Sequence, residues 1–213
     1  MDIVNPAVED YMLALQRRYD EPVLLEMEEE GEERGFPIIG RLCGVTIEMM
    51  ARAIGAKRVF ELGSGYGYSA YWFSRAVGPD GELHLTDGNP ENERKAADYL
   101  GRAGLDGPVT YHVGDALTSF ASVEGEWDVV FCDVDKDGYP DAWDAAKERI
   151  RVGGLYICDN VLWPPVLPPD SEDRRARLVE PIDRHNHSIA ADERYVSTIV
   201  PTREGVFTAL RIA

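Results

Sequence analysis

Two apolar stretches of the chain each end in side chains that could bind a metal ion. Asp133 follows the run at 127–132, and Asp159 and Asn160 follow the run at 154–158. If these runs are neighbouring parallel strands, their carboxyl ends meet at one sheet edge, where open α/β sheets bind ligands. Two carboxylates and an amide oxygen form a hard, oxygen-only ligand set. Such a set favours Mg²⁺, with Mn²⁺ or Ca²⁺ as alternatives, over zinc.

Lys136 follows Asp133 closely and could act as a general base beside a metal-bound hydroxyl. Taken singly, each of these residues has an ordinary structural explanation. A strand-end aspartate or an Asp-Asn pair is common in turns, and a single lysine is usually a surface residue. Their joint occurrence after two predicted strands, in a chain that also carries a nucleoside-type glycine turn, favours a catalytic metal site.

That glycine turn has glycine at positions 63, 65 and 67 and follows an apolar run at 57–62. Glycines let the backbone approach a ligand where a Cβ would collide. The dinucleotide fingerprint would need a glycine where Tyr68 stands, and a phosphate-binding P-loop would need Gly-Lys-Ser/Thr. Glu61 would repel a pyrophosphate but suits a cationic ligand end, such as the amino group of a methionine moiety. Asp87 ends the next strand, at 82–86, and could accept hydrogen bonds from ribose hydroxyls.

The elements that must position these residues alternate along the chain. Strands are predicted at 57–62, 82–86, 109–113, 127–132 and 154–158, and helices at 7–33, 42–54, 68–77, 90–103, 115–121 and 140–150. This order predicts an α/β fold with a doubly wound, mostly parallel sheet and helices on both faces. Two β-rich runs, 195–200 and 206–212, predict a C-terminal antiparallel hairpin that brings the sheet to seven strands. The segment 163–173 is predicted to be an exposed loop.

Composition narrows the class of protein. A chain of 213 residues with 44% hydrophobic content predicts a single domain, 1–213, in which residues 1–40 form an N-terminal helical arm or lid. A net charge of −17 argues against a nucleic-acid substrate. With no signal peptide, no long apolar run and three scattered cysteines that suit buried thiols, the chain is expected to be cytoplasmic, without a membrane partner.

The acidic composition also motivates the hypothesis that the source lives at high salt, where screened acidic surfaces keep proteins in solution. A GC-rich genome that favours arginine over lysine is the alternative explanation. Stability that does not rise in molar KCl would contradict the high-salt hypothesis.

Several motifs together carry a family resemblance. They are Glu61-Leu62-Gly63 with Gly67-Tyr68-Ser69, Gly114-Asp115-Ala116, Asp133-Val134-Asp135-Lys136-Asp137-Gly138-Tyr139 and Asp159-Asn160-Val161-Leu162-Trp163. From about Ala7 to its end, the chain resembles the cation-dependent class I S-adenosylmethionine (SAM) O-methyltransferases, which include caffeoyl-CoA and catechol O-methyltransferases. The tail residues Asn186, Arg194 and Glu204-Gly205 also fit this pattern, with Glu204 in place of the usual aspartate.

The resemblance implies a Rossmann-like fold, SAM and a divalent cation as cofactors, and a homodimer. It implies SAM contacts at Ile39, Glu61, Gly63, Ser64, Gly67, Tyr68, Ser69, Asp87, Asp115, Ala116 and Asp133. It implies metal ligands Asp133, Asp159 and Asn160, with Lys136 as the catalytic base.

The expected reaction is methyl transfer to a small catechol-like phenol. A cation that binds both oxygens of a vicinal diol would lower the pKa of a hydroxyl. Plant caffeoyl-CoA enzymes have asparagine where this chain has Pro164, and the acidic arm offers little for a CoA phosphate, so a free phenol is preferred. Trp163 could form one side of the pocket for the substrate ring, or it could have only a structural role in packing. The alternatives are a non-catechol natural-product hydroxyl, a SAM-binding module with little activity, and, third, a nicotinamide dehydrogenase.

Overall fold

The computed structural model describes residues 4–162 and 174–213. The loop predicted at 163–173, with Trp163 and Pro164, lies outside the described residues. The strands are β1 (Arg58–Leu62), β2 (Glu82–Asp87), β3 (Val109–Val113), β4 (Trp127–Cys132), β5 (Ile150–Cys158), β6 (Tyr195–Val200) and β7 (Val206–Arg211). The helices are α1 (Pro6–Leu15), α2 (Pro22–Arg34), α3 (Gly40–Ala53), α4 (Tyr68–Val77), α5 (Pro90–Arg102), α6 (Ala116–Ser122), α7 (Tyr139–Ala146) and α8 (Val179–Ala190), with short 3₁₀ turns η1 (Arg17–Tyr19), η2 (Lys136–Gly138) and η3 (Arg174–Leu178).

The strands form one seven-stranded sheet in the order β3-β2-β1-β4-β5-β7-β6. Strands β1 to β5 pair in parallel, and β7 pairs antiparallel with both β5 and β6. The predicted doubly wound sheet with its C-terminal hairpin is therefore confirmed. The strand order reverses next to β1, since β2 lies on one side of it and β4 on the other. Ligand crevices of doubly wound sheets lie at such a switch point.

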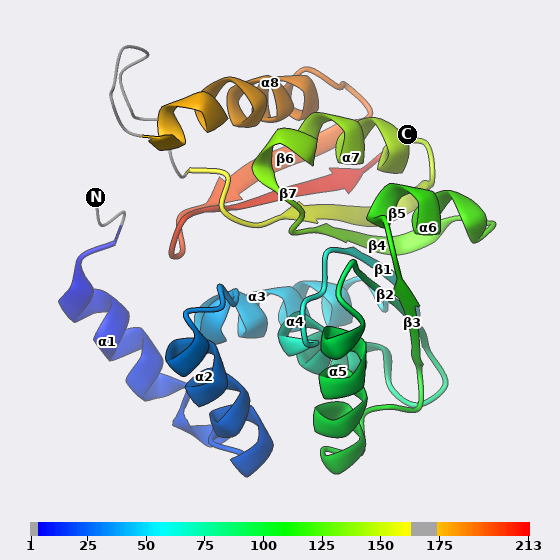
Figure 1. Ribbon diagram of the computed structural model, residues 1–213. Coiled ribbons are helices and arrows are strands. Elements are labelled where there is room, and N and C mark those ends of the chain that lie inside the picture. The colour runs from blue at the N-terminus through cyan, green and yellow to red at the C-terminus, as the bar shows by residue number, and fades with distance from the viewer. Residues whose placement is uncertain (1–3, 163–173) are drawn as a thin grey trace.

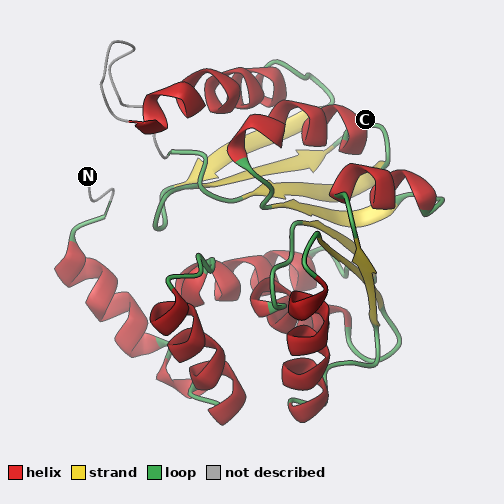
Figure 2. Ribbon diagram, in the orientation of Figure 1, coloured by secondary structure: helices red, strands yellow, loops and turns green. Residues whose placement is uncertain are grey.

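Helices cover both faces of the sheet (Figures 1 and 2). Helices α6, α7 and α8 lie on one face, and α3, α4 and α5 lie on the other. Each face has its own apolar core, and β4 contributes to both because successive side chains point to opposite sides. Val129 and Phe131 enter the core under α4, whereas Val130 and Cys132 enter the core under α7. Burial on two faces explains why the central strands lack strict apolar–polar alternation.

The N-terminal region is not the continuous helix predicted over 7–33. It divides into α1, the turn η1 and α2, because Pro22 cannot continue a preceding helix and instead begins α2 as its first residue. Helix α2 packs into the core through Leu24 and Met27, both fully buried, while α1 has no buried residue. Figure 1 shows α1 at the outside of the helical layer.

Two boundaries and one helix differ from prediction. Helix α7 ends at Ala146, and β5 begins already at Ile150, so the predicted helix 140–150 is too long and the predicted strand 154–158 too short. Helix α8 had no sequence prediction. Its buried positions are Ile182, His185 and Ile189, which recur at helical spacing.

The buried imidazole of His185 makes stability depend on pH. Its ring Nε2 lies 3.1 Å from the Tyr156 hydroxyl, and burial lowers the pKa of His185 from 6.5 to about 4. The unfolded chain therefore binds a proton at a pH where the folded chain does not. Stability from the neutral ring is present above about pH 6.5 and is lost as pH falls towards about 4.

We expect wild type to lose roughly 3 kcal/mol relative to His185→Gln across that window. Urea unfolding at several pH values measures the difference. His187→Gln, on the exposed side of the same helix, is the control and should follow wild type. Parallel pH profiles for wild type and His185→Gln would contradict the assignment.

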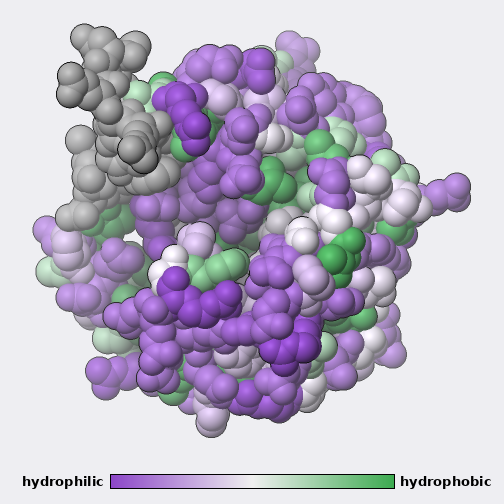
Figure 3. Space-filling model, viewed as in Figure 1, coloured by the Kyte–Doolittle hydropathy of each residue, from purple (hydrophilic) through white to green (hydrophobic). Residues whose placement is uncertain are grey.

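Hydrophilic residues dominate the face of the molecule seen in Figure 3, in keeping with the acidic composition. The three cysteines, Cys43, Cys132 and Cys158, are free and buried, as predicted. In residues 4–162 and 174–213, none of the helices combines the length and the apolar character that crossing a bilayer requires.

Candidate active site

The glycine turn after β1 lies directly against the end of β4. Gly63, Gly65 and Gly67 all have positive φ, at 85°, 49° and 89°. At Gly63 the need is also steric, because an added Cβ would lie 2.5 Å from the carbonyl oxygen of Asp133. The same two segments are tied by the Asp133 N–H, which donates to the Leu62 carbonyl at 2.8 Å. We use the term metal edge for the predicted metal ligands Asp133, Asp159 and Asn160. The glycine turn is therefore in direct contact with this metal edge.

Glu61 is fully buried beneath this turn. Its Oε2 accepts a hydrogen bond from the Ser69 hydroxyl at 3.1 Å, while its Oε1 has no partner among the described residues. Burial raises the pKa of Glu61 to about 8, against the opposing effect of hydrogen bonds from Ser64 and Ser69. A buried carboxyl with an unused oxygen can accept hydrogen bonds from a cationic group that enters the pocket.

Thr86, which the sequence reasoning missed, holds the turn to β2. Its hydroxyl donates to the Glu61 carbonyl at 2.8 Å and accepts from the Gly63 N–H at 2.9 Å, and its carbonyl accepts from the Ser64 N–H at 2.8 Å. The sequence signal that could have identified Thr86 is its position directly before Asp87, at the end of a predicted strand. At Asp87, Oδ1 accepts from the Asn89 N–H at 2.7 Å and from the Asn92 amide at 3.0 Å. Oδ2 accepts nothing from the described residues, so one oxygen is available to a ligand.

Asp115 and Ala116 stand at the start of α6, after β3. The Asp115 side chain caps this helix by accepting from the Thr118 N–H at 2.7 Å, which with the Thr118 hydroxyl lowers the pKa of Asp115. Asp115 and Ala116 line a cavity of about 550 Å³ together with Asp87 and Gly63. The structure thus brings the predicted residues after β1, β2 and β3 to one continuous edge.

Asp133 and Asp159 follow two strands that are paired in register. Cys132 of β4 pairs with Cys158 of β5, so the next residue on each strand lies side by side at the carboxyl edge. The carboxylate of Asp159 is buried, and its Oδ1 has no hydrogen-bond partner among the described residues. Burial raises the pKa of Asp159 to about 6. Burial and the charge of Asp159 also raise the pKa of Asp133 well above its usual range, although Lys136 opposes this.

Asn160 joins three parts of the site. Its backbone has the left-handed φ of 57°, which asparagine tolerates better than most residues. Its Oδ1 accepts from Lys136 Nζ at 2.8 Å, and its Nδ2 donates to Glu204 Oε2 at 2.7 Å. Lys136 Nζ also lies 3.9 Å from Asp133 Oδ1. Glu204 comes from the turn between β6 and β7, so the C-terminal hairpin completes this edge.

These residues share one cavity of about 510 Å³. It runs from the glycine turn to the metal edge, and its lining includes Gly63, Ser64, Ser69, Asp133, Lys136, Asp159 and Asn160. The loop before α3 forms another wall through Phe36, Pro37, Ile38 and Ile39. Gly67, also predicted to bind the cofactor, is not part of this lining; its Cβ position faces Ala96 instead.

The N-terminal helices support the glycine turn from behind. The Tyr66 hydroxyl donates to the Met27 carbonyl at 2.8 Å, and the Tyr68 hydroxyl donates to Glu28 at 2.7 Å. Both acceptors belong to α2. Glu28 of α2 thus has a structural role, because it accepts from Tyr68 and also pairs with Arg41.

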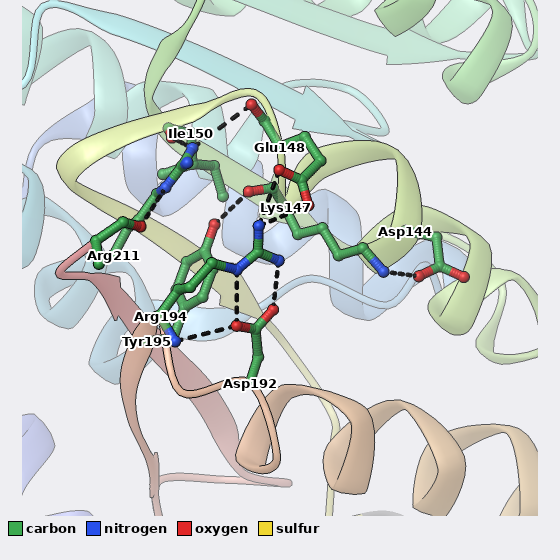
Figure 4. Close-up of polar contacts among 9 residues, drawn as sticks. Asp144, Lys147, Glu148, Ile150, Asp192, Arg194, Tyr195 and Arg211 are labelled. Atoms are coloured by element: carbon green, nitrogen blue, oxygen red, sulfur yellow. Dashed lines mark hydrogen bonds and ion pairs between the residues drawn. The ribbon is translucent and has the colours of Figure 1, made fainter.

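Arg194 does not line this cavity, and Figure 4 shows its polar contacts. Its guanidinium binds Glu148 at 2.7 Å and Asp192 at 2.6 Å, at the start of β6 and thus at the opposite edge of the sheet. Asn186 is closer, since its side-chain amide donates to the Val161 carbonyl at 3.0 Å behind the metal edge. Arg194 therefore stabilises the fold at a distance from the cavity.

No group of three or more His, Cys, Asp and Glu side chains that could hold a metal ion gathers in the described part of the chain. The predicted ligand set is of a different kind, because its third member is the amide of Asn160. An orphaned, buried Asp159 oxygen beside a second carboxylate fits a hard cation, since a cation would favour the ionised forms that burial disfavours.

Comparison with known proteins identifies the family of this chain. A family profile described as O-methyltransferase matches residues 18–212. Caffeoyl-CoA O-methyltransferase 1 of Eucalyptus globulus is 30% identical over 179 residues, which cover 80% of this chain and 73% of that enzyme.

Solved structures that resemble this chain are also methyltransferases. A methyltransferase from Geobacter sulfurreducens superposes with a TM-score of 0.83 at 27% identity, covering 99% of this chain and 98% of that one. The O-methyltransferase TomG of Streptomyces achromogenes, which is involved in tomaymycin synthesis and was solved with SAM, has a TM-score of 0.80 at 27% identity and covers 91% of each chain. With its glycine turn and carboxyl-edge cavity, this chain therefore belongs to the family of SAM-dependent O-methyltransferases.

Proposed function

We propose that this enzyme methylates a hydroxyl of a small catechol-like phenol and depends on a divalent cation, with Mg²⁺ preferred. The observation that carries the proposal is the convergence of Asp133, Asp159 and Asn160 in the same cavity as the glycine turn. A methyl donor and a metal-held hydroxyl could thus meet in one enclosed space, which is what in-line transfer requires.

SAM would bind along the edge formed by the ends of β1, β2 and β3. Glu61 would accept hydrogen bonds from its amino group, with Ser64 and Ser69 nearby. The free oxygen of Asp87 would accept from the ribose, and Asp115 and Ala116 would lie beside the base. Ile39, Tyr68 and Asp133 would close the pocket, and Gly67 would shape the turn.

Asp133, Asp159 and Asn160 would hold the cation, which when bound lowers the pKa of a neighbouring hydroxyl. Lys136 would accept the proton from the acceptor hydroxyl. It would do so in its neutral form. The position of its Nζ, 2.8 Å from Asn160 Oδ1 and 3.9 Å from Asp133 Oδ1, supports this role. Glu204 would orient the Asn160 amide by accepting from its Nδ2.

The acceptor is proposed to be a free phenol, although the Eucalyptus relative is named for a CoA ester. Helix α2 carries the acidic run 26–33, which would repel the phosphates of a CoA group. A natural-product hydroxyl is the second candidate, because TomG belongs to a biosynthetic route. We also propose that the enzyme is a cytoplasmic homodimer and that its source lives at high salt.

A methyl-transfer assay with SAM over a panel of catechols, monophenols and a catechol-bearing CoA ester tests the proposal. We expect turnover of catechols with Mg²⁺, none after EDTA treatment, and recovery when Mg²⁺ is restored. Turnover that persists in EDTA would defeat the metal dependence, and methylation of the CoA ester alone would defeat the free phenol.

Glu61 should couple SAM binding to proton release. Without ligand, its pKa of about 8 keeps it largely protonated at pH 7. Pairing with an ammonium group favours the ionised form, so SAM binding should release close to one proton at that pH. The affinity for SAM should accordingly rise up to roughly tenfold between pH 6 and 7.

Calorimetric titration at pH 7 in two buffers of different ionisation enthalpy measures the proton count. Glu61→Gln should bind SAM roughly 10- to 100-fold more weakly and release no proton. Glu124→Gln, at an exposed position, is the matched control. Equal proton release by wild type and Glu61→Gln would contradict this role.

A further inference from the structure

The turn between β6 and β7 reaches from the metal edge to the N-terminal helices. It is seated on the segment after Asn160 by two backbone hydrogen bonds, from the Val161 N–H to the Gly205 carbonyl at 3.1 Å and from the Leu162 N–H to the Glu204 carbonyl at 2.8 Å. These bonds fix the turn independently of its side chains. One side chain of the turn, Glu204, already binds Asn160.

The neighbouring residue, Arg203, is held in an unusual conformation. Its φ is 47°, and in the described part of the chain only Asn160 is another non-glycine residue with positive φ. Its Nη1 donates to the Ile38 carbonyl in the loop before α3. Gly40 leaves room for it, since an added Cβ at that position would lie 2.9 Å from Arg203 Nη1. Strained residues of this kind cluster at ligand-binding sites.

Arg203 forms no ion pair within the described residues, although its charge partly offsets the effect of burial on the pKa of Asp159. No carboxylate there lies within ion-pair distance of its guanidinium, and its other nitrogens make no hydrogen bond. The neighbouring Arg41 differs, because Asp20 and Glu28 both pair with it. The open edge of a guanidinium matches a carboxylate, with two parallel N–H donors for two oxygens.

Arg203 also stands where a second part of the acceptor would lie. It lines the 510 Å³ cavity that contains Asp133, Asp159 and Lys136, and it lines an adjoining cavity of about 640 Å³ between α1 and α3. Both linings carry acidic groups, among them Asp87 and Asp135 in the first and Glu9 and Asp10 in the second. The first lining also contains Lys136, and the second also contains Arg17 and Arg41. The bases in the described lining of the first cavity are Lys136 and Arg203. Because Lys136 is hydrogen-bonded to Asn160, an anionic group in this cavity would be attracted chiefly to Arg203.

We propose that Arg203 is a specificity-determining residue that binds a carboxylate on the phenolic acceptor, so that the substrate class is carboxylated catechols. This inference rests on the proposed function, since it assumes that the acceptor hydroxyl lies at the Asp133–Asp159 edge. The carboxylate pairs with the open side of the guanidinium, while the Ile38 carbonyl keeps the opposite side in place.

The test compares matched acceptors with wild type and Arg203→Gln. Each carboxylated catechol (3,4-dihydroxybenzoate, its phenylacetate homologue and its cinnamate homologue) is assayed beside the corresponding methyl ester and beside catechol. For at least one acid, wild type should show a kcat/KM well above that of its ester. Arg203→Gln should lower that value roughly 10- to 100-fold and leave catechol and the esters within about twofold.

Two controls separate this role from a structural one. Arg184→Gln removes the same charge from the exposed side of α8 and should match wild type with every acceptor. Arg203→Lys should restore part of the preference for the acid, because it restores the charge without the bidentate fork. Calorimetry with SAM shows whether Arg203 serves the cofactor carboxylate instead.

The outcomes are distinct. Equal losses with acids, esters and catechol, no acid preference in wild type, or a tenfold loss of SAM affinity in Arg203→Gln would each overturn the inference while the proposed function stands. If no phenol is methylated, the proposed function fails. Calorimetric binding of the dihydroxy acids to wild type and Arg203→Gln then decides the role of Arg203 by itself.

Discussion

Replacement of Asp159 by alanine is expected to lower kcat by roughly 10³-fold. The proposed cation would contribute several kcal/mol of stabilisation to the developing phenolate, and about 1.4 kcal/mol corresponds to a factor of ten in rate. Asp159 is the buried carboxylate of the site, and its unpaired oxygen is the one best placed to bind a cation. Without it, Asp133 and Asn160 alone would hold the metal weakly.

The same variant should fold normally. Asp159 Oδ1 has no hydrogen bond to lose, and the Tyr139 hydroxyl donates to the backbone carbonyl of Asp159, which alanine retains. The carboxyl accepts a hydrogen bond from the Asn160 backbone N–H, but burial disfavours its ionised form more strongly. Its removal should therefore leave the melting temperature of the metal-free protein equal or higher. A loss of activity with unchanged melting therefore identifies a functional role.

Initial rates over a range of Mg²⁺ concentrations, together with thermal melting in EDTA, provide the measurement. Asp144→Asn serves as the control, since it removes an acid from an exposed position on α7. If Asp159→Ala retains wild-type turnover at saturating Mg²⁺, the ligand assignment is wrong.

Replacement of Lys136 by methionine is the second large effect, with an expected loss of about 10²- to 10⁴-fold in kcat, the range for removal of a general base. Lys136 begins the η2 turn directly after the end of β4, and its Nζ is bonded to Asn160. Methionine keeps most of the apolar stem but removes the proton acceptor. The KM for SAM should change little, because Nζ lies at the metal edge and not under the glycine turn.

Single-turnover rates measured from pH 6 to 10 separate the base from a positioning role. With the base gone, the rate of Lys136→Met should rise with hydroxide concentration over this range and approach wild type at the alkaline end. Lys147→Met, which removes a lysine that pairs with Asp144 on the surface, is the control. A uniformly reduced rate with an unchanged pH profile would assign Lys136 to orientation of Asn160 alone.

Much of this site could be predicted because it is built at strand ends. Asp87, Asp133 and Asp159 each stand at the end of a predicted strand, and parallel pairing must bring such ends to one edge. The glycine turn was equally readable, since positive φ at 63, 65 and 67 selects glycine locally. In both cases the information lies within a few residues of the position concerned.

The remaining features depend on contacts that no local pattern encodes. Glu204 meets Asn160, and Arg203 meets Ile38, only because β7 inserts between β5 and β6 and carries its turn to the carboxyl edge. Helix α8 escaped prediction because its first turn contains Pro181 and its buried face includes His185, which dilute the apolar pattern. The division of the N-terminal region into α1 and α2, in contrast, depends on a local feature. Pro22 begins α2 and could have predicted it from the sequence.

The close contact between Gly63 and the Asp133 carbonyl also bears on the order in which parts of the site form during folding. The glycine turn belongs to β1 and the metal edge begins after β4, two segments that pair although three helices and two strands separate them in sequence. Such non-local parallel pairing forms more slowly than local contacts do. Before β4 joins β1, the turn lacks the wall that shapes it and Asp133 lacks its hydrogen bond to Leu62. The wall of the glycine turn and the position of Asp133 therefore depend on the same pairing of β1 with β4.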